Sequence, residues 1–393
     1  MVLNNLTLVE SQQTVNISVK GKIISDVSEK KTSLIEDNFQ IDFDDAFAFP
    51  GLINSHDHLD FNCFPILNER TYNNYTEWGK EIHKKYKNEI NEVLKIPQRL
   101  RAAWGMYKNL LAGVTTVVNH GPVLNIKDPL ITIRQEFQCL HSVKFEYFWQ
   151  WKLNNPFLKD KECVIHTGEG TDIQSSDEID KLLWWNFWKR KLIGIHGVAM
   201  NPNQAKRFHG LVWCPESNRV LLNKEANIER FKNYTRIVLG TDSTLTGNWN
   251  AWHHLRSARL TKQVSDLELY EMVTRAPSKL WNCHNGDIRH GRKADIVIAK
   301  GNKVDTVWDR FYNTDPDDIL MVIHKGKIRL IDADYFSRLK HINFDASRFF
   351  PVKIKDSVKY VEGNLPVLIN DIKSYYPKAV FPCSFTGKLK NGR

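Results

Sequence analysis

The sequence predicts an α/β fold, a TIM-like (β/α)8 barrel with a composite β-sandwich domain built from both ends of the chain. Between residues 51 and 285, short apolar stretches alternate with segments of helical spacing, a pattern typical of parallel strands with connecting helices. About eight such units favour a closed barrel over an open sheet. Alternating, turn-containing segments at 14–27 and 318–332 indicate hairpins on either side of this region.

Three regions follow from this division. Residues 1–50 and 286–335 are expected to form the composite β-sandwich domain, and residues 51–285 are expected to form the barrel. Residues 336–393 are expected to be a C-terminal extension, with prolines at positions 351, 366, 377 and 382. This prediction requires segments far apart in the sequence to pair in a single β domain.

The first half of the barrel is assigned from apolar runs and helix signals. A strand is expected in AFAFPGLINSHDH (46–58), and a helix that ends at a glycine in 96–113. VTTVVNHG (114–121) is expected to be the second strand. DPLITIRQEFQCLHS (128–142) is interpreted as a helix and VKFEYFWQW (143–151) as a strand.

The second half contains four apolar runs that are expected to be strands, in ECVIHTGEG, LIGIHG, GLVWCPESN and RIVLGTDS. SSDEIDKLLWWNFWKRK (175–191) is expected to be a helix, with serine near its start and basic residues at its end. Only ten residues, 152–161, separate VKFEYFWQW from ECVIH, which is too few for a complete strand–helix unit. The barrel is therefore expected to be reduced around its fourth strand.

Composition limits the function classes. The chain has 393 residues and a net charge of +10, but its basic residues are dispersed and carry no nucleic-acid-binding signature. A solvated basic surface is favoured, with a preference for anionic substrates as the alternative. The six cysteines are scattered, and no apolar run is long enough to span a membrane. We expect a cytoplasmic homodimer that binds a small molecule, with no nucleic-acid or membrane partner.

Polar residues recur where the expected strands end. His56 and His58 point to the same side of a strand, whereas Asp57 points to the other side. His166, His196 and Asp242 end three later strands. The carboxyl ends of parallel barrel strands open on one rim, so these side chains are expected to converge there. Four histidines and one aspartate form a ligand set suited to zinc or to ferrous iron.

The motifs PGLINSHDH, HTGE, HG, CPESN, LGTDS and RHGRKADIVIAKGN occur in an order that resembles the amidohydrolase superfamily. They are most similar to its aminohydrolase and chlorohydrolase subgroup, which includes guanine, cytosine and adenosine-type deaminases and triazine hydrolases. The resemblance implies one divalent metal, zinc in preference to iron, bound by His56, His58, His166 and Asp242. It also implies that Asp242 shuttles a proton, that Glu169 exchanges protons with the substrate, and that His196 faces the reacting groups.

Two features limit this comparison. Relatives usually carry substrate-contacting groups on the fourth strand. Because that strand is reduced here, the resemblance does not identify the substrate. Dinuclear relatives bridge two metals with a modified lysine on that strand, but Lys152 precedes His166 by only 14 residues, so one metal is favoured. Trp249 and Trp252 are assigned to substrate stacking, with packing of the rim helices as the alternative.

These observations predict a metal-dependent hydrolase of a C–N bond in a small, heterocyclic molecule, with deamination as the favoured reaction. One alternative is the hydrolysis of a cyclic amide, or of another leaving group, at the same site. A second alternative is a non-catalytic binding protein with an amidohydrolase fold. The intact ligand set argues against the second alternative, because burying these polar groups without a ligand is costly.

Overall fold

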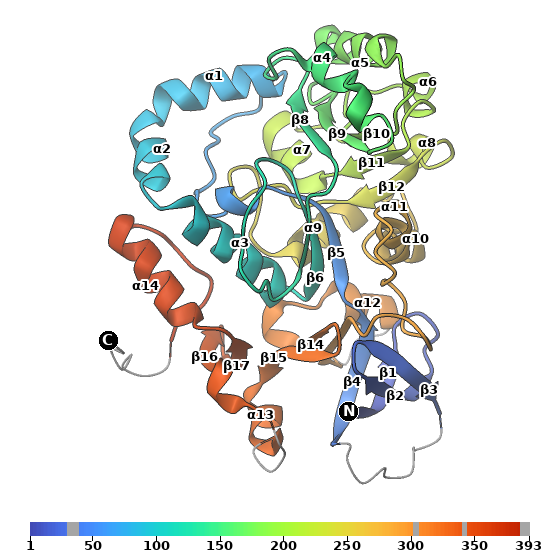
Figure 1. Cartoon of the computed structure of the whole chain (residues 1–393), viewed down its shortest axis with the longest axis vertical. Helices are drawn as coiled ribbons and strands as arrows, with labels where there is room; N and C mark the ends of the chain where they lie inside the picture. Colours follow the sequence, from blue (N-terminus) through green and yellow to red (C-terminus); the bar gives the residue numbers. More distant parts are fainter. Residues whose placement is uncertain (30–38, 302–305, 340–343, 386–393) are drawn as a thin grey trace.

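The structure is a computed structural model that describes residues 1–29, 39–301, 306–339 and 344–385. Parts of the expected β domain and of the expected C-terminal extension fall on 30–38, 302–305, 340–343 and 386–393, which lie outside the described residues. The nine-stranded sheet described below lies at one end of the molecule, and helices α4 and α5 lie at the other end (Figure 1).

The central part of the chain contains eight parallel strands in two sheets. The three-stranded sheet has the order β5-β6-β7, and the five-stranded sheet has the order β12-β11-β10-β9-β8. Their bounds are β5 (Leu52–Asp57), β6 (Val114–Asn119), β7 (Thr132–Arg134), β8 (Gln138–Ser142), β9 (Cys163–Thr167), β10 (Leu192–His196), β11 (Gly210–Trp213) and β12 (Arg236–Leu239). Every residue of β5, β6, β9, β10 and β11 is buried, as expected for parallel strands covered on both faces.

The strand pairing of the described residues does not by itself close these two sheets into a barrel. At one junction the sheets are linked after β12, where the backbone N–H groups of Thr241 and Asp242 each donate to the His56 carbonyl, at 3.0 Å. β7 and β8 are not paired with each other within the described part of the chain. The α/β class is therefore confirmed, and the closed barrel stays a prediction.

Helices connect the strands and cover them. They are α1 (Tyr75–Lys85), α2 (Lys87–Leu94), α3 (Gln98–Leu111), α4 (Trp149–Leu153), α5 (Ile173–Trp185), α6 (Pro202–Ala205), α7 (Pro215–Leu222), α8 (Ile228–Phe231), α9 (Ala251–Leu260), α10 (Asp266–Glu271), α11 (Arg275–Leu280), α12 (Val307–Tyr312), α13 (Ala333–Leu339) and α14 (Leu365–Tyr375). Four 3-10 turns add η1 (Leu59–Phe61), η2 (Pro156–Leu158), η3 (Pro316–Asp318) and η4 (Ala346–Arg348). Among the described helices, none has the length and apolar character needed to cross a membrane.

Both chain ends contribute to one nine-stranded sheet, in the order β16-β17-β15-β14-β13-β4-β1-β2-β3 (Figure 1). Its strands are β1 (Val2–Leu8), β2 (Thr14–Lys20), β3 (Ile23–Ser28), β4 (Gln40–Pro50), β13 (Ile296–Lys300), β14 (Ile319–His324), β15 (Lys327–Asp332), β16 (Phe349–Ile354) and β17 (Ser357–Glu362). The antiparallel pair β4–β13 joins the two ends. This single nine-stranded sheet supports the expected β-sandwich domain only in part. The boundaries expected for the domains stay predictions.

Two expected elements differ from the structure. Residues 128–142 were expected to be helical, but they contain the strands β7 and β8, with three residues between them. The β-branched run Ile131-Thr132-Ile133 suits a strand and outweighs the apparent helical spacing. The strand expected at 143–151 is instead a turn followed by α4, because most of its aromatic side chains are exposed and no sheet face buries them.

The observed strands show where the α/β region departs from regular alternation of strand and helix. The fourth parallel strand is present as β8, and a connecting helix is absent from the three residues between β7 and β8, all of which are described. Between β8 and β9 the chain forms α4 and η2. The irregularity therefore lies on both sides of the fourth strand.

Candidate metal and active site

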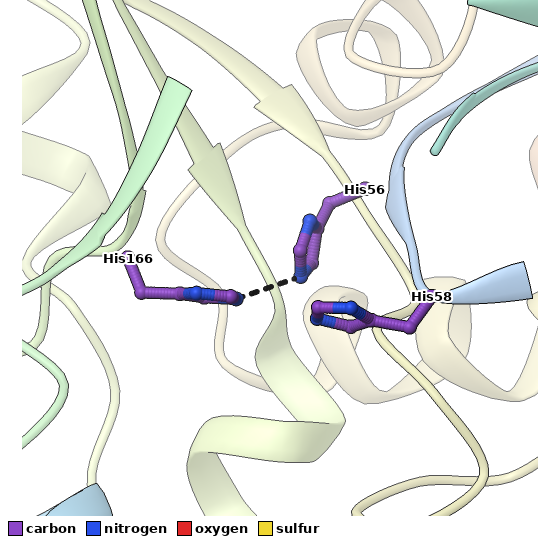
Figure 2. A group of neighbouring side chains, drawn as sticks. All are labelled: His56, His58 and His166. Carbon is purple, nitrogen blue, oxygen red and sulfur yellow. Dashed lines mark hydrogen bonds between the residues drawn. The ribbon is translucent and has the colours of Figure 1, made fainter. Parts of the chain in front are cut away.

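Three histidines meet at the carboxyl ends of two strands (Figure 2). His56 lies on β5, His58 follows β5 directly, and His166 lies on β9. One ring nitrogen from each lies within 4.8 Å of the others, and the Nε2 atoms of His56 and His166 are 3.2 Å apart. The Nδ1–H of His166 donates to the backbone carbonyl of His141 at 2.9 Å, which leaves Nε2 free to bind a cation.

Asp242 completes this group from the loop after β12. Its Oδ1 lies 3.7 Å from Nε2 of His56 and 3.7 Å from Nε2 of His58. The Ser217 hydroxyl donates to its Oδ2 at 2.8 Å. Burial opposes ionisation of this carboxyl, but the neighbouring imidazoles of His58 and His196 and the Ser217 hydrogen bond together lower its pKa. Asp242 is therefore a carboxylate at neutral pH.

Glu169 and His196 lie beside this group. The Nε2 of His196 is 3.6 Å from Oε2 of Glu169, and its Nδ1–H donates to Oδ1 of Asn218 at 2.9 Å. Burial raises the pKa of Glu169 well above its usual value, and the neighbouring negative charges of Asp242 and Glu178 raise it further. The two carboxyl groups of the site are thus driven toward opposite protonation states.

The donor set fits one divalent cation. His56 and His166 are buried, and burial followed by repulsion from nearby histidines lowers their pKa well below the usual value, so both imidazoles are neutral. Neutral imidazole is the form that binds metal. His196 belongs to a second group with His56 and Asp242, whose ligand atoms also lie within 4.8 Å of one another. The chain therefore presents neutral nitrogen donors and one carboxylate around a single position.

A cavity of about 540 Å³ opens over these residues. His58, His166, Glu169, His196 and Asp242 contribute to its polar wall. The rest of the lining is largely aromatic and aliphatic, and includes Phe61, Tyr75, Trp78, Ile82, Phe145 and Leu245. Such a volume is within the range of small-molecule sites, and few charged groups other than those at the ligand cluster face it.

The two tryptophans assigned to substrate stacking do not line this cavity. Trp252 is fully buried on α9 and packs edge-on against Phe49 and Phe311, with ring centroids 5.6 and 5.1 Å away. Trp249 is half-buried against the core and lines a separate hollow near Tyr376. Trp252 therefore packs in the core, because α9 turns it inward, and Trp249, which precedes α9, packs partly against the core. Trp78 and Phe145 occupy the cavity wall instead.

A comparison with known protein families finds a match in the second half of the α/β region. Residues 159–329 match the amidohydrolase family model. This stretch is an amidohydrolase domain. The predicted resemblance is therefore confirmed, and the matched residues include His166, Glu169, His196 and Asp242. No curated protein sequence matches the chain.

Three solved structures share the fold of this chain. An atrazine chlorohydrolase from Arthrobacter aurescens, complexed with zinc, has 16% identity and a TM-score of 0.65, covering 83% of this chain and 94% of its own. An adenosine deaminase from Xanthomonas campestris with bound zinc has 14% identity and a TM-score of 0.66, covering 96% and 98%. An aminofutalosine deaminase from Helicobacter pylori, in complex with methylthio-coformycin, has 15% identity and a TM-score of 0.58, covering 83% and 99%.

Two further histidines beside the cluster were not singled out from the sequence. His120 follows β6, and its ring centroid lies 4.4 Å from that of His166 and 5.2 Å from that of His56. It is buried, and neither ring nitrogen has a hydrogen-bond partner. His141, on β8, lines the cavity. The signal was available for His120, because VTTVVNH ends in histidine like the runs that end in His166 and His196.

A buried polar network lies behind the histidine pair. Asp57 points away from the cavity, and its carboxylate accepts from Nζ of Lys108 at 3.0 Å, Nδ2 of Asn109 at 2.7 Å and Nδ2 of Asn62 at 2.8 Å. Lys108 is 1% exposed. Asn54 connects this network to the loop that carries Asp242, because its Nδ2 donates to Oγ1 of Thr241 at 2.8 Å. The network thus fixes both segments that supply ligands.

Proposed function

We propose that this chain is a metal-dependent hydrolase that cleaves a C–N bond in a small heterocyclic molecule, with deamination as the favoured reaction. The observation that carries the proposal is the pair of carboxyl groups beside the histidine cluster. Environment lowers the pKa of Asp242 and raises that of Glu169, and both face one cavity. Titratable groups whose pKa values are driven apart in this way identify a base and an acid.

His56, His58, His166 and Asp242 would hold the cation, and zinc is the favoured identity. Imidazole and carboxylate donors suit zinc, and two of the structures with this fold were solved with zinc. A divalent cation bound there supplies Lewis-acid chemistry that makes water acidic enough to react at neutral pH. Lys152, the candidate bridge for a second metal, is exposed on α4 and pairs with Glu146, which supports a single metal.

The roles proposed for the chain's own residues follow from their charge and position. Asp242, as a carboxylate, accepts the proton that water releases. Glu169, as a neutral acid, donates a proton to a ring nitrogen or to the leaving group. His196 is oriented by Asn218, and its Nε2 faces the cavity 3.6 Å from Glu169, where it can stabilise charge that develops on the substrate.

The cavity favours a planar and largely uncharged substrate. The ring of Phe145 lies edge-on to that of Tyr75, with centroids 5.2 Å apart, and Trp78 lines the same wall. Aromatic walls stack well on heterocycles.

We also propose that the two parallel sheets are parts of one closed, eight-stranded barrel. The hydrogen bonds from Thr241 and Asp242 to His56 support closure at one junction.

Two alternative functions use the same site. Displacement of a different leaving group is favoured by the resemblance in fold to an atrazine chlorohydrolase, and cyclic-amide hydrolysis would need the same acid and base. A binding protein without activity would require the cavity, but it would not require two carboxyl groups in opposite protonation states. A cytoplasmic location and a homodimer stay predictions from the sequence.

Metal analysis and a substrate screen test this proposal together. The purified protein should contain about one zinc or iron per chain, and it should release ammonia from at least one aminated heterocycle. Release of chloride or of a ring-opened product without ammonia would favour the alternatives. Protein that binds no divalent metal after metal supplementation would refute the proposal.

Glu169→Gln provides the sharper catalytic test. The amide keeps the size of the side chain but cannot exchange the proton, so turnover should fall roughly a hundred- to ten-thousand-fold while the metal content stays normal. Glu225→Gln is the matched control, because burial also raises the pKa of Glu225, to about 7, but Glu225 does not line the cavity. Its turnover should stay within a few-fold of wild type. Equal losses in both variants would argue against Glu169 as the acid.

A further inference from the structure

Seven large aromatic side chains are exposed at one end of the molecule, close to α4 and α5. Each is between 52% and 92% exposed, which is unusual for rings of this size. We call this group the aromatic surface, and it comprises Tyr147, Phe148, Trp151, Phe157, Trp184, Phe187 and Trp188.

The aromatic surface is continuous although its residues come from two segments. Asn154, at the end of α4, joins the segments through its side chain and backbone. Its Nδ2 donates to the Trp185 carbonyl at 2.8 Å, its Oδ1 accepts from the Phe187 N–H at 3.2 Å, and its carbonyl accepts from Nε1 of Trp188 at 3.1 Å. The rings of Trp184 and Phe187 pack against each other with centroids 5.9 Å apart. These hydrogen bonds therefore hold together the two segments that carry the exposed rings.

Basic residues outnumber acidic residues in the segments that carry these rings. Segments 144–162 and 177–191 contain seven exposed lysines and five acidic residues besides the buried Glu178. One of the five, Glu146, is paired with Lys152. The seven lysines are Lys144, Lys152, Lys159, Lys161, Lys181, Lys189 and Lys191. The partner of this surface should therefore be anionic and should accept inserted aromatic rings.

We propose that the aromatic surface binds the headgroup region of an anionic lipid bilayer. Tryptophan and other aromatic rings insert at the boundary between headgroups and acyl chains, and lysines beside them attract anionic lipids. A second copy of the chain fits this surface less well, because a symmetric contact would place two lysine-rich faces against each other. Surface binding requires no spanning segment, so it is compatible with the absence of such a helix from the described residues.

One edge of the aromatic surface lies near the cavity. Phe145 lies in the cavity wall and packs against Tyr75, and the exposed residues Tyr147 and Phe148 follow it within three residues. Trp184, Phe187 and Trp188 instead lie at the end of α5, just before the start of β10. This inference is independent of the reaction that the site performs.

Vesicle co-sedimentation tests the proposal with the full chain. Vesicles of phosphatidylcholine alone are compared with vesicles that also contain phosphatidylglycerol, at low and at high salt. Binding should require the anionic lipid and should weaken as salt screens the lysines. Intrinsic tryptophan emission should shift to shorter wavelength on binding.

A variant with Trp151→Ala, Phe157→Ala and Trp184→Ala should bind at least tenfold more weakly. These side chains are 80%, 92% and 69% exposed, so their truncation should not disturb folding. The matched control carries Val123→Ala, Leu260→Ala and Val380→Ala, which remove side chains of 79%, 73% and 91% exposure elsewhere on the surface. It should bind like wild type.

Three outcomes would overturn the proposal. The first is no sedimentation with anionic vesicles, and the second is equal loss of binding in the two triple variants. The third is a wild-type dimer that Trp151→Ala, Phe157→Ala and Trp184→Ala convert to a monomer, which would assign the aromatic surface to a second copy. Light scattering in solution measures this third outcome. None of these results depends on the metal or on a known substrate.

Discussion

Removal of the Lys108 ammonium should destabilise the fold and weaken metal binding together. Lys108→Met keeps much of the apolar stem but leaves the buried Asp57 carboxylate without its cation, which is 3.0 Å away. Breaking a buried ion pair on one side costs about 3–5 kcal/mol. Asn109 and Asn62 still donate to the carboxylate at 2.7 and 2.8 Å, so we expect a loss near the lower end, about 3 kcal/mol.

Denaturant unfolding measures the loss of stability, because a shift of the unfolding midpoint at constant slope reports a change in the free energy of unfolding. Competition with a chelator measures the loss of metal affinity. Asp57 lies between His56 and His58, and loss of an outer partner of a ligand-bearing segment costs about ten- to a hundredfold in metal affinity. Addition of Asp57→Asn to Lys108→Met should recover part of the stability, since the uncompensated charge is then removed.

Lys359→Met is the matched control. Lys359 is also fully buried, and its Nζ lies 2.7 Å from Asp332 in the nine-stranded sheet. We expect a comparable loss of stability in this variant and unchanged metal affinity. A loss below about 1 kcal/mol in Lys108→Met would refute the energetic reasoning. Equal effects of both variants on metal affinity would refute the positional reasoning.

Three further predictions concern the site. Asp242→Asn should nearly abolish turnover, because an amide cannot accept the water proton, and metal content measured in parallel separates catalysis from binding. His120→Asn should alter the visible spectrum of the cobalt-substituted protein if His120 contacts the bound cation, and an unchanged spectrum would make it a packing residue. Burial raises the pKa of Glu178 to about 7. Folding therefore favours its protonated form, so wild-type stability should fall as pH rises from 4.5 through about 7. Glu178→Gln should remove up to about 3 kcal/mol of that loss in pH-dependent unfolding.

The sequence was most informative where local pattern and burial agree. β5, β9 and β10 are buried apolar runs that end in histidine, and the structure brings His56, His58, His166, His196 and Asp242 together. Strand ends therefore located the cluster without any knowledge of the loops. The expected helix at 96–113 also agrees with α3, whose Gly105 allows the backbone of η1 to approach closely.

Prediction failed where tertiary burial decided the local structure. β7 and β8 are only partly buried and short, so apolar spacing could not separate them from a helix. The aromatic run at 143–151 has high strand propensity, but no neighbouring strand pairs with it among the described residues. Trp252 and Trp249 follow the last strand in sequence, yet the direction of α9 turns Trp252 into the core. Sequence spacing gave no information on that direction.

The ligand positions explain how the chain can lose regular structure near β7 and β8 and still keep a site. The proposed ligands come from β5, β9 and the loop after β12, and backbone hydrogen bonds to His56 hold β5 and the Asp242 loop together. β8 supplies the His141 side chain to the cavity wall and the His141 backbone carbonyl, which accepts from His166, but none of the proposed ligands. The chain between β8 and β9 is therefore under little constraint from the metal position. It is this segment that exposes Trp151 and Phe157, so we infer that the irregular region supplies a binding surface while the regular geometry of the other strands supplies the chemistry.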